Sequence, residues 1–220
     1  MRTRIKICGI TKPADASRIV DLGVDAIGLV FYPKSPRAVD IGTAKEICTS
    51  LPALVACVAV FVDATPNEIE RVLSSMPITL LQFHGQETAT NCEQYGIPYI
   101  KAVRMKQEIS PESVAESHPN AKAILLDSYH KGKIGGTGES FEWERVLECK
   151  SKPIILAGGL SPLNIAEAMT ITKPYGIDVS TGVEIRPGIK DEDKLQNLVA
   201  AVRECDNILS SGMESSRMKR

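Results

Sequence analysis

The 220-residue sequence lacks several features that mark whole classes of protein. No apolar run approaches the roughly 18 residues that a membrane-spanning helix requires, and the N-terminus lacks the charged-then-apolar pattern of a secretory signal. The formal net charge of -1 provides no broad cationic surface for nucleic acid or anionic lipid. These absences predict a cytoplasmic protein that has neither a membrane nor a nucleic acid as its partner.

Paired cysteines are absent as well. The six cysteines are scattered without a Cys-x-x-Cys pair, and they share no metal-ligand spacing with the three histidines. The sequence therefore predicts free thiols and no metal site. The cysteines stand at positions 8, 48, 57, 92, 149 and 205.

The composition does provide for one substantial core. Hydrophobic residues make up 43% of the chain and charged residues 24%, as in an ordinary globular protein, and the length suits one α/β barrel domain. We expect this domain over residues 1–206, followed by a frayed tail over residues 207–220, where the pattern fades into a Ser-rich, basic segment. The start at Met1, directly before the first expected strand, predicts a stand-alone chain.

Short apolar runs alternate with amphipathic segments, and there are eight of each. The runs are nearly continuously apolar, which is typical of parallel strands covered on both faces. Eight strand–helix units favour a closed (β/α)8 TIM barrel over an open, doubly wound sheet, which would leave two or three runs unexplained. The expected strands are Arg4–Cys8, Asp25–Phe31, Leu54–Val62, Thr79–Phe83, Tyr99–Val103, Ala123–Asp127, Pro153–Ala157 and Gly176–Ser180.

Helix boundaries are signalled in the connecting segments. Thr65-Pro66-Asn67-Glu68 is a capping-box pattern with proline at the first helical position, and Ser110-Pro111 and Ser161-Pro162 repeat this start signal. Gly23 and Gly96 stand where a left-handed residue would end a helix. The last helix, from about residue 191, is expected to bury Leu195, Leu198, Val199 and Val202.

Two candidate catalytic residues follow from the rule that catalytic groups of a barrel stand at the carboxyl ends of its strands. Cys8 ends the first strand, although a free cysteine is also a common small core residue. Asp127 ends the apolar sixth strand, and a helix cap or an ion pair is its alternative role. The Gly-rich segment 131–138 that follows is long enough to form either a lid or a simple tether.

Two glycine-bearing loops predict a phosphate site. Gly158-Gly159-Leu160-Ser161-Pro162 follows the seventh strand, and Ser180-Thr181-Gly182 follows the eighth. Barrels often bind phosphate there, because glycines let backbone N–H groups approach the anion and a helix N-terminus adds a favourable dipole. One such loop alone would be ordinary turn punctuation, so the prediction depends on the pair.

Two further polar residues are candidates for binding. Arg37 lies in a loop that Pro33 and Pro36 stiffen, and its guanidinium suits a carboxylate, although a solvated arginine is the commoner case. His84 at the end of the fourth strand either lines the site or is a hydrogen-bonded structural histidine.

Together these segments resemble the phosphoribosylanthranilate isomerase family of tryptophan biosynthesis, over nearly the whole chain up to about Asp206. The ordered set of motifs is far more specific than any single motif. Two departures are conservative, with Phe83 where the family often has leucine and Thr181 where it often has serine. The motifs are Lys6-Ile7-Cys8-Gly9-Ile10-Thr11, Ser35-Pro36-Arg37, Phe61-Val62-Asp63, Gln82-Phe83-His84-Gly85, Leu126-Asp127, Gly135-Gly136-Thr137-Gly138, Gly158-Gly159-Leu160 and Asp178-Val179-Ser180-Thr181-Gly182-Val183-Glu184.

The resemblance implies an aldose–ketose isomerase, an intramolecular oxidoreductase of the third step of tryptophan synthesis from chorismate. Its reaction is the Amadori rearrangement of N-(5-phosphoribosyl)anthranilate to 1-(o-carboxyphenylamino)-1-deoxyribulose 5-phosphate. It implies that Asp127 is the general acid that opens the furanose ring to a Schiff base, and that Cys8 is the general base that removes the proton from C2′. The acid and the base need opposite protonation states at neutral pH, so nearby cations and dipoles would have to lower the pKa of Cys8.

The resemblance also implies the remaining ligand contacts. Arg37 would hold the anthranilate carboxylate, and the two glycine-bearing loops would hold the ribose phosphate. No metal or organic cofactor is required, and we expect a monomer whose partner is the small-molecule substrate. The substrate-binding residues implied are Arg37, His84, Gly158, Gly159, Asp178, Ser180, Thr181 and Gly182.

Other readings compete with this one. The histidine-pathway aminoaldose isomerase uses two aspartates, one of them at the end of the first strand, where this chain has Cys8. Ribulose-phosphate epimerase binds a metal through histidines and aspartates at several strand ends, and only His84 is well placed here. A non-catalytic phosphate-binding barrel conflicts with the intact candidate residues. A redox sensor at Cys8 lacks a resolving cysteine nearby in the sequence.

Overall fold

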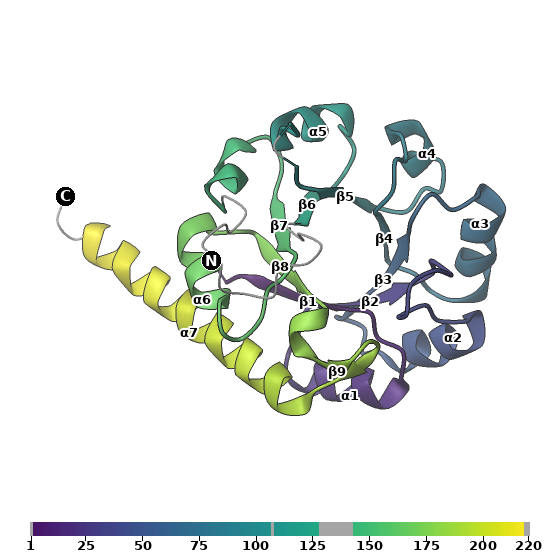
Figure 1. The fold of residues 1–220 in the computed structure, drawn as a ribbon, viewed down its shortest axis with the longest axis horizontal. Coiled ribbons are helices and arrows are strands. Elements are labelled where there is room, and N and C mark those ends of the chain that lie inside the picture. Colours follow the sequence, from purple (N-terminus) through teal and green to yellow (C-terminus); the bar gives the residue numbers. More distant parts are fainter. Residues whose placement is uncertain (1, 107, 128–142, 218–220) are drawn as a thin grey trace.

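Eight parallel strands form a closed barrel in the computed structural model, which describes residues 2–106, 108–127 and 143–217 (Figure 1). Each strand pairs with its neighbours in chain order, and β8 closes the ring by pairing with β1. The expected (β/α)8 architecture is thereby confirmed. The strands are β1 (Arg4–Cys8), β2 (Ala26–Val30), β3 (Ala56–Phe61), β4 (Leu80–Phe83), β5 (Tyr99–Arg104), β6 (Ala123–Asp127), β7 (Ile154–Ala157) and β8 (Gly176–Val179).

Helices surround this barrel and lie between consecutive strands (Figure 1). The described part of the connection from β6 to β7 contains a 3-10 helix, η1 (Trp143–Glu148). After β8 the chain forms a short 3-10 turn, η2 (Thr181–Val183), and then a hairpin of β9 (Glu184–Arg186) and β10 (Ile189–Lys190). The α-helices are α1 (Pro13–Asp21), α2 (Ile41–Ser50), α3 (Pro66–Ser75), α4 (Ala89–Glu93), α5 (Pro111–Ser117), α6 (Ile165–Thr172) and α7 (Glu192–Arg217).

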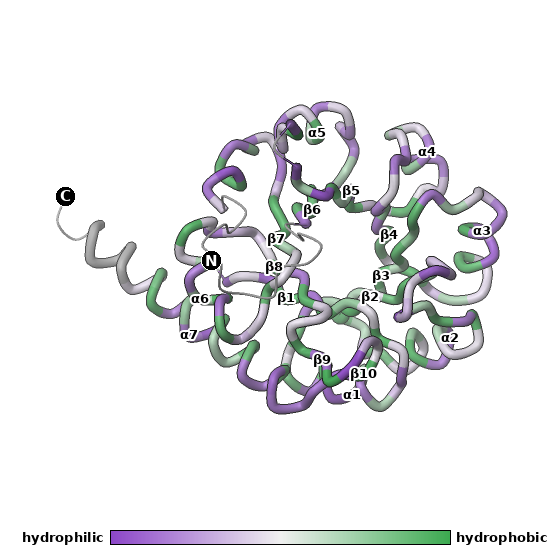
Figure 2. Tube along the Cα trace, viewed as in Figure 1, coloured by the Kyte–Doolittle hydropathy of each residue, from purple (hydrophilic) through white to green (hydrophobic). Residues whose placement is uncertain are grey.

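The main hydrophobic core lies between the sheet and the helices, because alternate strand residues point to opposite faces. Ile5 and Ile7 of β1, for example, are fully buried in this outer layer. Two smaller apolar clusters fill the interior of the barrel, one centred on β5 and β6 and the other on β2 and β3. Hydrophobic residues accordingly concentrate along the strands, and the outer surfaces of the helices are more hydrophilic (Figure 2). Polar side chains that point into the barrel therefore need partners inside it.

Most of the expected helix signals are confirmed. Thr65 and Glu68 form a reciprocal capping box at the start of α3, and Ser110 accepts a hydrogen bond from the backbone of Ser113 at the start of α5. Gly23 and Gly96 both adopt positive φ angles of 74° and 65°. Among the described residues, the four apolar side chains predicted for the inner face of α7 are all buried.

One expected helix start is wrong. Helix α6 begins at Ile165, not after Ser161-Pro162, because Asn164 Oδ1 accepts the backbone N–H of Ser161 and forms a turn ahead of the helix. Helix α7 continues past Asp206 to Arg217, since Leu209 still packs against the core and no proline interrupts this segment. In Figure 1 its last turns extend away from the barrel. The segment 131–138, considered above as a lid, lies outside the described residues.

No helix in the described part of the chain is both long enough and apolar enough to cross a membrane. This agrees with the absence of long apolar runs in the sequence.

Candidate active site

Polar side chains from several strands point into the barrel near its carboxyl end. In β1, Ile5 and Ile7 face the helices, so the alternation points Lys6 and Cys8 inward. The same alternation points Asp127 of β6 inward, because Leu126 packs in the outer layer. The strand residues on this inner, polar surface are Lys6, Cys8, Gln82, Asp127 and Asp178.

One cavity of about 420 Å³ brings the predicted residues together. It includes both candidate catalytic residues and both glycine-bearing loops, and Gly182 is the one predicted site residue that does not line it. A larger hollow of about 780 Å³ beside the loops that follow β4 and β5 contains neither Cys8 nor Asp127. The smaller cavity is lined by Cys8, Arg37, Gln82, His84, Asp127, Ala157, Gly158, Gly159, Leu160, Asp178, Val179, Ser180 and Thr181.

Cys8 lies at the base of this cavity, partly buried, with its backbone held in place. Its carbonyl oxygen accepts a hydrogen bond of 2.7 Å from Lys190 Nζ. Burial raises the pKa of the Cys8 thiol, and the charge of Asp178 adds to this, whereas the ammonium groups of Lys6 and Lys190 lower it. The net direction of the Cys8 pKa is upward, opposite to the lowering that the role of general base would require.

Asp127 stands across the cavity next to His84. His84 Nε2 lies 3.3 Å from Asp127 Oδ2, and Nδ1 of the same ring lies 3.3 Å from Nε2 of Gln82. Gln82 is almost fully buried, so its contact with Nδ1 holds the imidazole of His84 beside the carboxyl group of Asp127. His84 therefore contacts the candidate acid directly, in addition to lining the cavity.

The two glycine-bearing loops touch one another. A Cβ at Gly182 would overlap the carbonyl oxygen of Leu160, so only glycine allows the loop after β8 to pack against the loop after β7. Gly158 and Gly159 adopt φ angles of 84° and 64°, which also favour glycine. The buried Oγ of Ser180 has no hydrogen-bond partner among the described residues and lies at the cavity wall. The Ser180 hydroxyl is thus available to a ligand at the place where the backbones of the two loops pack together.

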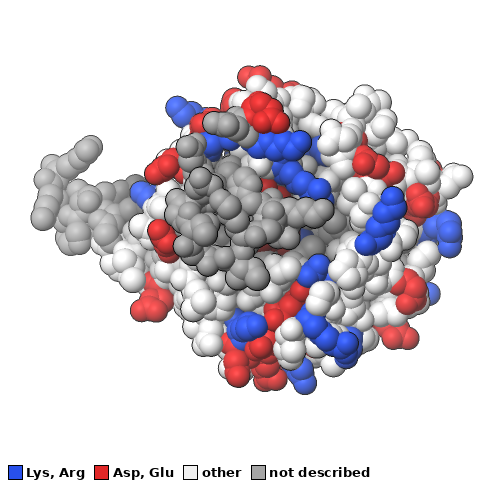
Figure 3. All heavy atoms as spheres, in the orientation of Figure 1, with Lys and Arg blue, Asp and Glu red and all other residues white. Residues whose placement is uncertain are grey.

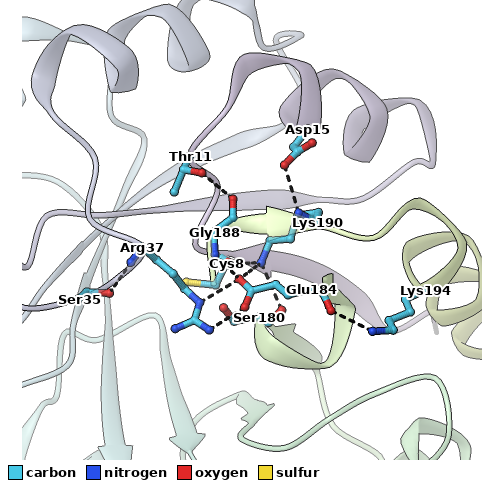
Figure 4. Close-up of polar contacts among 10 residues, drawn as sticks. All are labelled: Cys8, Thr11, Asp15, Ser35, Arg37, Ser180, Glu184, Gly188, Lys190 and Lys194. Carbon is cyan, nitrogen blue, oxygen red and sulfur yellow. Dashed lines mark hydrogen bonds and ion pairs between the residues drawn. The ribbon is translucent and has the colours of Figure 1, made fainter. Parts of the chain in front are cut away.

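Arg37 reaches the cavity from the loop after β2 and is held by Glu184 (Figure 4). Its Nε donates to Glu184 Oε1 over 2.9 Å, and its Nη2 donates to Oε2 over 2.6 Å. Lys190 Nζ donates to the same Oε1 over 2.9 Å. A Cβ at Gly9 would lie 2.5 Å from Arg37 Cδ, so Gly9 leaves room for the arginine stem. Glu184 therefore holds the guanidinium in one orientation.

Basic side chains gather around the central hollow of the face shown in Figure 3. The buried carboxylate of Glu184 stabilises two of the cations at this end, Arg37 and Lys190. Burial alone would raise the pKa of Glu184, but these two partners hold it below its usual value. The site thus combines ionised cations with a cavity suited to an anionic ligand.

Several residues of the site were absent from the predicted set. Lys6, Gln82 and Glu184 appear in the motifs but had no assigned role, and Lys190 was not considered. Lys6 and Gln82 could have been found as polar residues that share the inward parity of Cys8 and His84 within otherwise apolar strands. Lys190 gives no comparable signal, because its contact with Cys8 spans 182 positions.

Metal-ligating side chains do not cluster in the described ranges. Residues 2–106, 108–127 and 143–217 contain no group of three or more His, Cys, Asp or Glu side chains arranged to hold a metal ion. The cavity instead presents one thiol, one imidazole and two carboxylates, Asp127 and Asp178, on different strands.

Comparison with known proteins identifies relatives over nearly the whole chain. Residues 5–201 match the family model described as N-(5′-phosphoribosyl)anthranilate isomerase. A protein of that name from Pseudomonas fluorescens is 51% identical over 200 residues, which cover 91% of this chain and 95% of the relative.

Solved structures are similar as well. The crystal structure of phosphoribosyl anthranilate isomerase from Thermotoga maritima superposes with a TM-score of 0.78 at 36% identity, covering 92% of this chain and 99% of that one. A second structure of an enzyme of this name superposes with a TM-score of 0.80 at 35% identity and the same coverage, and it is a complex with reduced 1-(o-carboxyphenylamino)-1-deoxyribulose 5-phosphate.

Proposed function

The chain belongs to the N-(5′-phosphoribosyl)anthranilate isomerase family, and from this premise we propose which of its residues carry out the family reaction. That reaction is an Amadori rearrangement of N-(5-phosphoribosyl)anthranilate to 1-(o-carboxyphenylamino)-1-deoxyribulose 5-phosphate. It needs an acid at the ring oxygen and a base at C2′. The single cavity that contains both Cys8 and Asp127 is the observation that supports the proposal.

Asp127 is the general acid. Its carboxyl proton goes to the furanose ring oxygen, the bond between this oxygen and C1′ breaks, and the nitrogen lone pair forms the C1′=N bond of a Schiff base. His84, 3.3 Å from Asp127 Oδ2, fixes the position of the carboxyl group and can donate a hydrogen bond to the carboxylate that remains. The acid thus stays oriented after it has lost its proton.

Cys8 is the general base. Its thiolate takes the proton from C2′, the electrons of that C–H bond form a C1′=C2′ double bond, and the C1′=N electrons return to nitrogen. The resulting enolamine tautomerises to the ketone product. Because burial raises the pKa of Cys8, the thiolate becomes more populated as the pH rises. Activity controlled by this group therefore rises with pH.

The remaining residues orient the substrate. The loops at Gly158–Gly159 and Ser180–Gly182 hold the phosphate through backbone N–H groups and the Ser180 hydroxyl. Arg37, kept in place by Glu184, holds the anthranilate carboxylate. Asp178 lines the same cavity with its Oδ1 lacking a hydrogen-bond partner among the described residues, and it suits a substrate N–H or hydroxyl donor.

The test follows the fluorescence of the anthranilate group. Purified protein is mixed with freshly prepared phosphoribosylanthranilate, and spontaneous hydrolysis sets the baseline. We expect rapid decay with the wild type and a loss of roughly 10²- to 10⁴-fold in Asp127→Asn. Asp40→Asn is the matched control, since Asp40 caps α2 outside the cavity and asparagine also caps helices. Wild-type turnover in Asp127→Asn would remove this residue as the acid.

The monomeric state and the cytoplasmic location are part of the same proposal. Light scattering during gel filtration measures the mass in solution, and a mass twice that of the 23.8 kDa chain would contradict the monomer. Fractionation of the source cells tests the location.

A further inference from the structure

Lys6 is a buried cation inside the barrel, directly below the cavity. It precedes Cys8 by two residues on β1, so both side chains point to the same, inner face. Lys6 is paired in register with Asp178 of β8, and its Nζ donates to Asp178 Oδ2 over 2.8 Å. Both side chains are more than nine-tenths buried. A charge pair placed there loses hydration on both ions, so a purely apolar filling would cost less.

The space for this pair comes from Gly28 on β2. A Cβ at Gly28 would lie 2.7 Å from Cys8 Sγ and 3.0 Å from Lys6 Nζ. The thiol and the ammonium therefore border the same small volume, which any larger residue would fill. The Lys6 ammonium thus lies beside the sulfur of Cys8 and donates to the carboxylate of Asp178.

The charges around Cys8 come from four elements. Lys6 lies on its own strand, Asp178 faces it from β8, and Lys190 of β10 holds its carbonyl oxygen. Arg37 approaches from the loop after β2, but its charge is neutralised by a bidentate salt bridge with Glu184. Lys6 is thus the cation that lies beside the sulfur on the inner face of β1, with Asp178 competing for the same ammonium.

We propose that Lys6 is a positioning residue whose charge stabilises the Cys8 thiolate from beside the sulfur, so that Asp178 and the thiolate share one buried ammonium. This inference depends on the proposed role of Cys8 as the base. Although burial alone would lower the pKa of Lys6, Asp178 and Cys8 together raise it, so the residue stays charged. A protonated lysine cannot itself remove the proton from C2′. Its function is to stabilise the Cys8 sulfur that removes this proton.

Lys6 and Asp178 act on the Cys8 thiol with charges of opposite sign, and this makes the proposal testable without substrate. The rate of alkylation of Cys8 by iodoacetamide is measured against pH, with the modified peptide quantified by mass spectrometry. In Lys6→Met the thiolate loses its cation. We expect the midpoint of the pH dependence of Cys8 alkylation to rise by one pH unit or more, which reduces the alkylation rate at pH 7 about tenfold. In Asp178→Asn the competing anion is gone, and we expect the midpoint to fall.

Lys101→Met is the matched control. It breaks another buried ion pair, with Glu87, that has the same 2.8 Å distance and the same burial but points away from the cavity. The Cys8 midpoint should stay at the wild-type value in this variant. A Cys8 midpoint that is unchanged in Lys6→Met, or that moves in the same direction in Lys6→Met and Asp178→Asn, would overturn the inference.

A double variant covers the case in which Lys6→Met does not fold because Asp178 is left unpaired. Lys6→Met with Asp178→Asn removes both charges, and its Cys8 midpoint should lie above that of Asp178→Asn alone. Equal midpoints would contradict the role of Lys6. The titration of the Cys8 thiol is measured separately from turnover. A Cys8→Ser enzyme that stays active would reject Cys8 as the base. An inactive Cys8→Ser enzyme, together with an unchanged Cys8 midpoint in Lys6→Met, would reject only the role of Lys6.

Discussion

Two buried lysine–carboxylate pairs lie on opposite faces of the same sheet. Lys6–Asp178 and Lys101–Glu87 have the same N–O distance of 2.8 Å, and the side chains of both are 6% and 7% exposed. Lys6 points into the barrel, whereas Lys101 of β5 points outward, since its neighbours Ile100 and Ala102 fill the interior. Distance and burial therefore do not distinguish these pairs, but the direction of the side chains does.

The partners of the outer pair show a structural role. Lys101 Nζ also donates to Gly85 O over 2.7 Å, and Glu87 accepts the backbone N–H groups of Asp63 and Gly85. These contacts hold the loop that follows β4 and carries His84. In the inner pair, by contrast, Asp178 Oδ1 has no hydrogen-bond partner among the described residues, and the ammonium borders the same small volume as the Cys8 thiol. An unsatisfied polar atom beside a reactive group marks the pair that serves chemistry.

The largest expected effect comes from the inner face. Cys8→Ser should lower kcat by roughly 10²- to 10⁴-fold with little change in KM, because serine keeps the size of the side chain and lacks the basicity of a thiolate. Cys149→Ser, a change at a half-buried cysteine outside the cavity, should keep wild-type kinetics. Steady-state kinetics with both variants decide the matter, and near-wild-type turnover in Cys8→Ser would be incompatible with its role as the base.

The outer pair should instead affect stability. Lys101→Met leaves Glu87 buried without its cation, and we expect a loss of about 3–5 kcal/mol in the free energy of unfolding. Burial raises the pKa of Glu87, but Lys101 and the backbone of Asp63 hold it below its usual value. This contribution is therefore present above about pH 4.3 and is lost as the pH falls through the lowered native pKa.

Urea unfolding of wild type and Lys101→Met at neutral and acid pH measures this difference. The gap between the two proteins should be widest near neutral pH and should narrow as the pH falls below about 4.3, until Glu87 is protonated at its lowered native pKa. A gap that stays constant with pH would mean that lost packing, and not the unpaired carboxylate, causes the destabilisation.

The architecture could be predicted from the sequence because each strand is a continuous apolar run, and β1 and β6 have the expected bounds. The exact ends of some elements were not predictable. Helix α6 begins only after a turn in which Asn164 accepts the Ser161 N–H, and Leu54 lies before β3, almost fully exposed. Local patterns thus locate an element more reliably than they locate its first residue.

The candidate site was predictable where the barrel rule applies, since Cys8, His84 and Asp127 all follow from their position at strand ends. The contacts that support them were not. Arg37 and Glu184 are 147 positions apart, and Lys6 and Asp178 are 172 apart, so nothing local couples them. The direction of the Cys8 pKa shift could not be predicted from the sequence either, because it results from burial that only the closed barrel creates.

The smallest effects should come from the two glycine-bearing loops, where a matched pair of changes separates backbone conformation from close packing. The added Cβ of Gly159→Ala contacts no other atom, but the residue must keep a φ of 64°. We therefore expect a loss of about 1–2 kcal/mol in the free energy of unfolding. Gly182→Ala would place a methyl group against the Leu160 carbonyl oxygen. This overpacking should lower the free energy of unfolding by about 1–3 kcal/mol and move the two loops apart.

Thermal melting and KM are measured for both variants, together with inhibition by inorganic phosphate. If the loops hold the phosphate as one unit, Gly182→Ala should weaken phosphate inhibition and raise KM in parallel, because the Ser180 hydroxyl moves away from the loop after β7. Unchanged phosphate inhibition in a folded Gly182→Ala protein would mean that the anion is held elsewhere. Since neither change touches Cys8 or Asp127, kcat should fall less than kcat/KM, unlike the loss in Cys8→Ser, which lowers both equally.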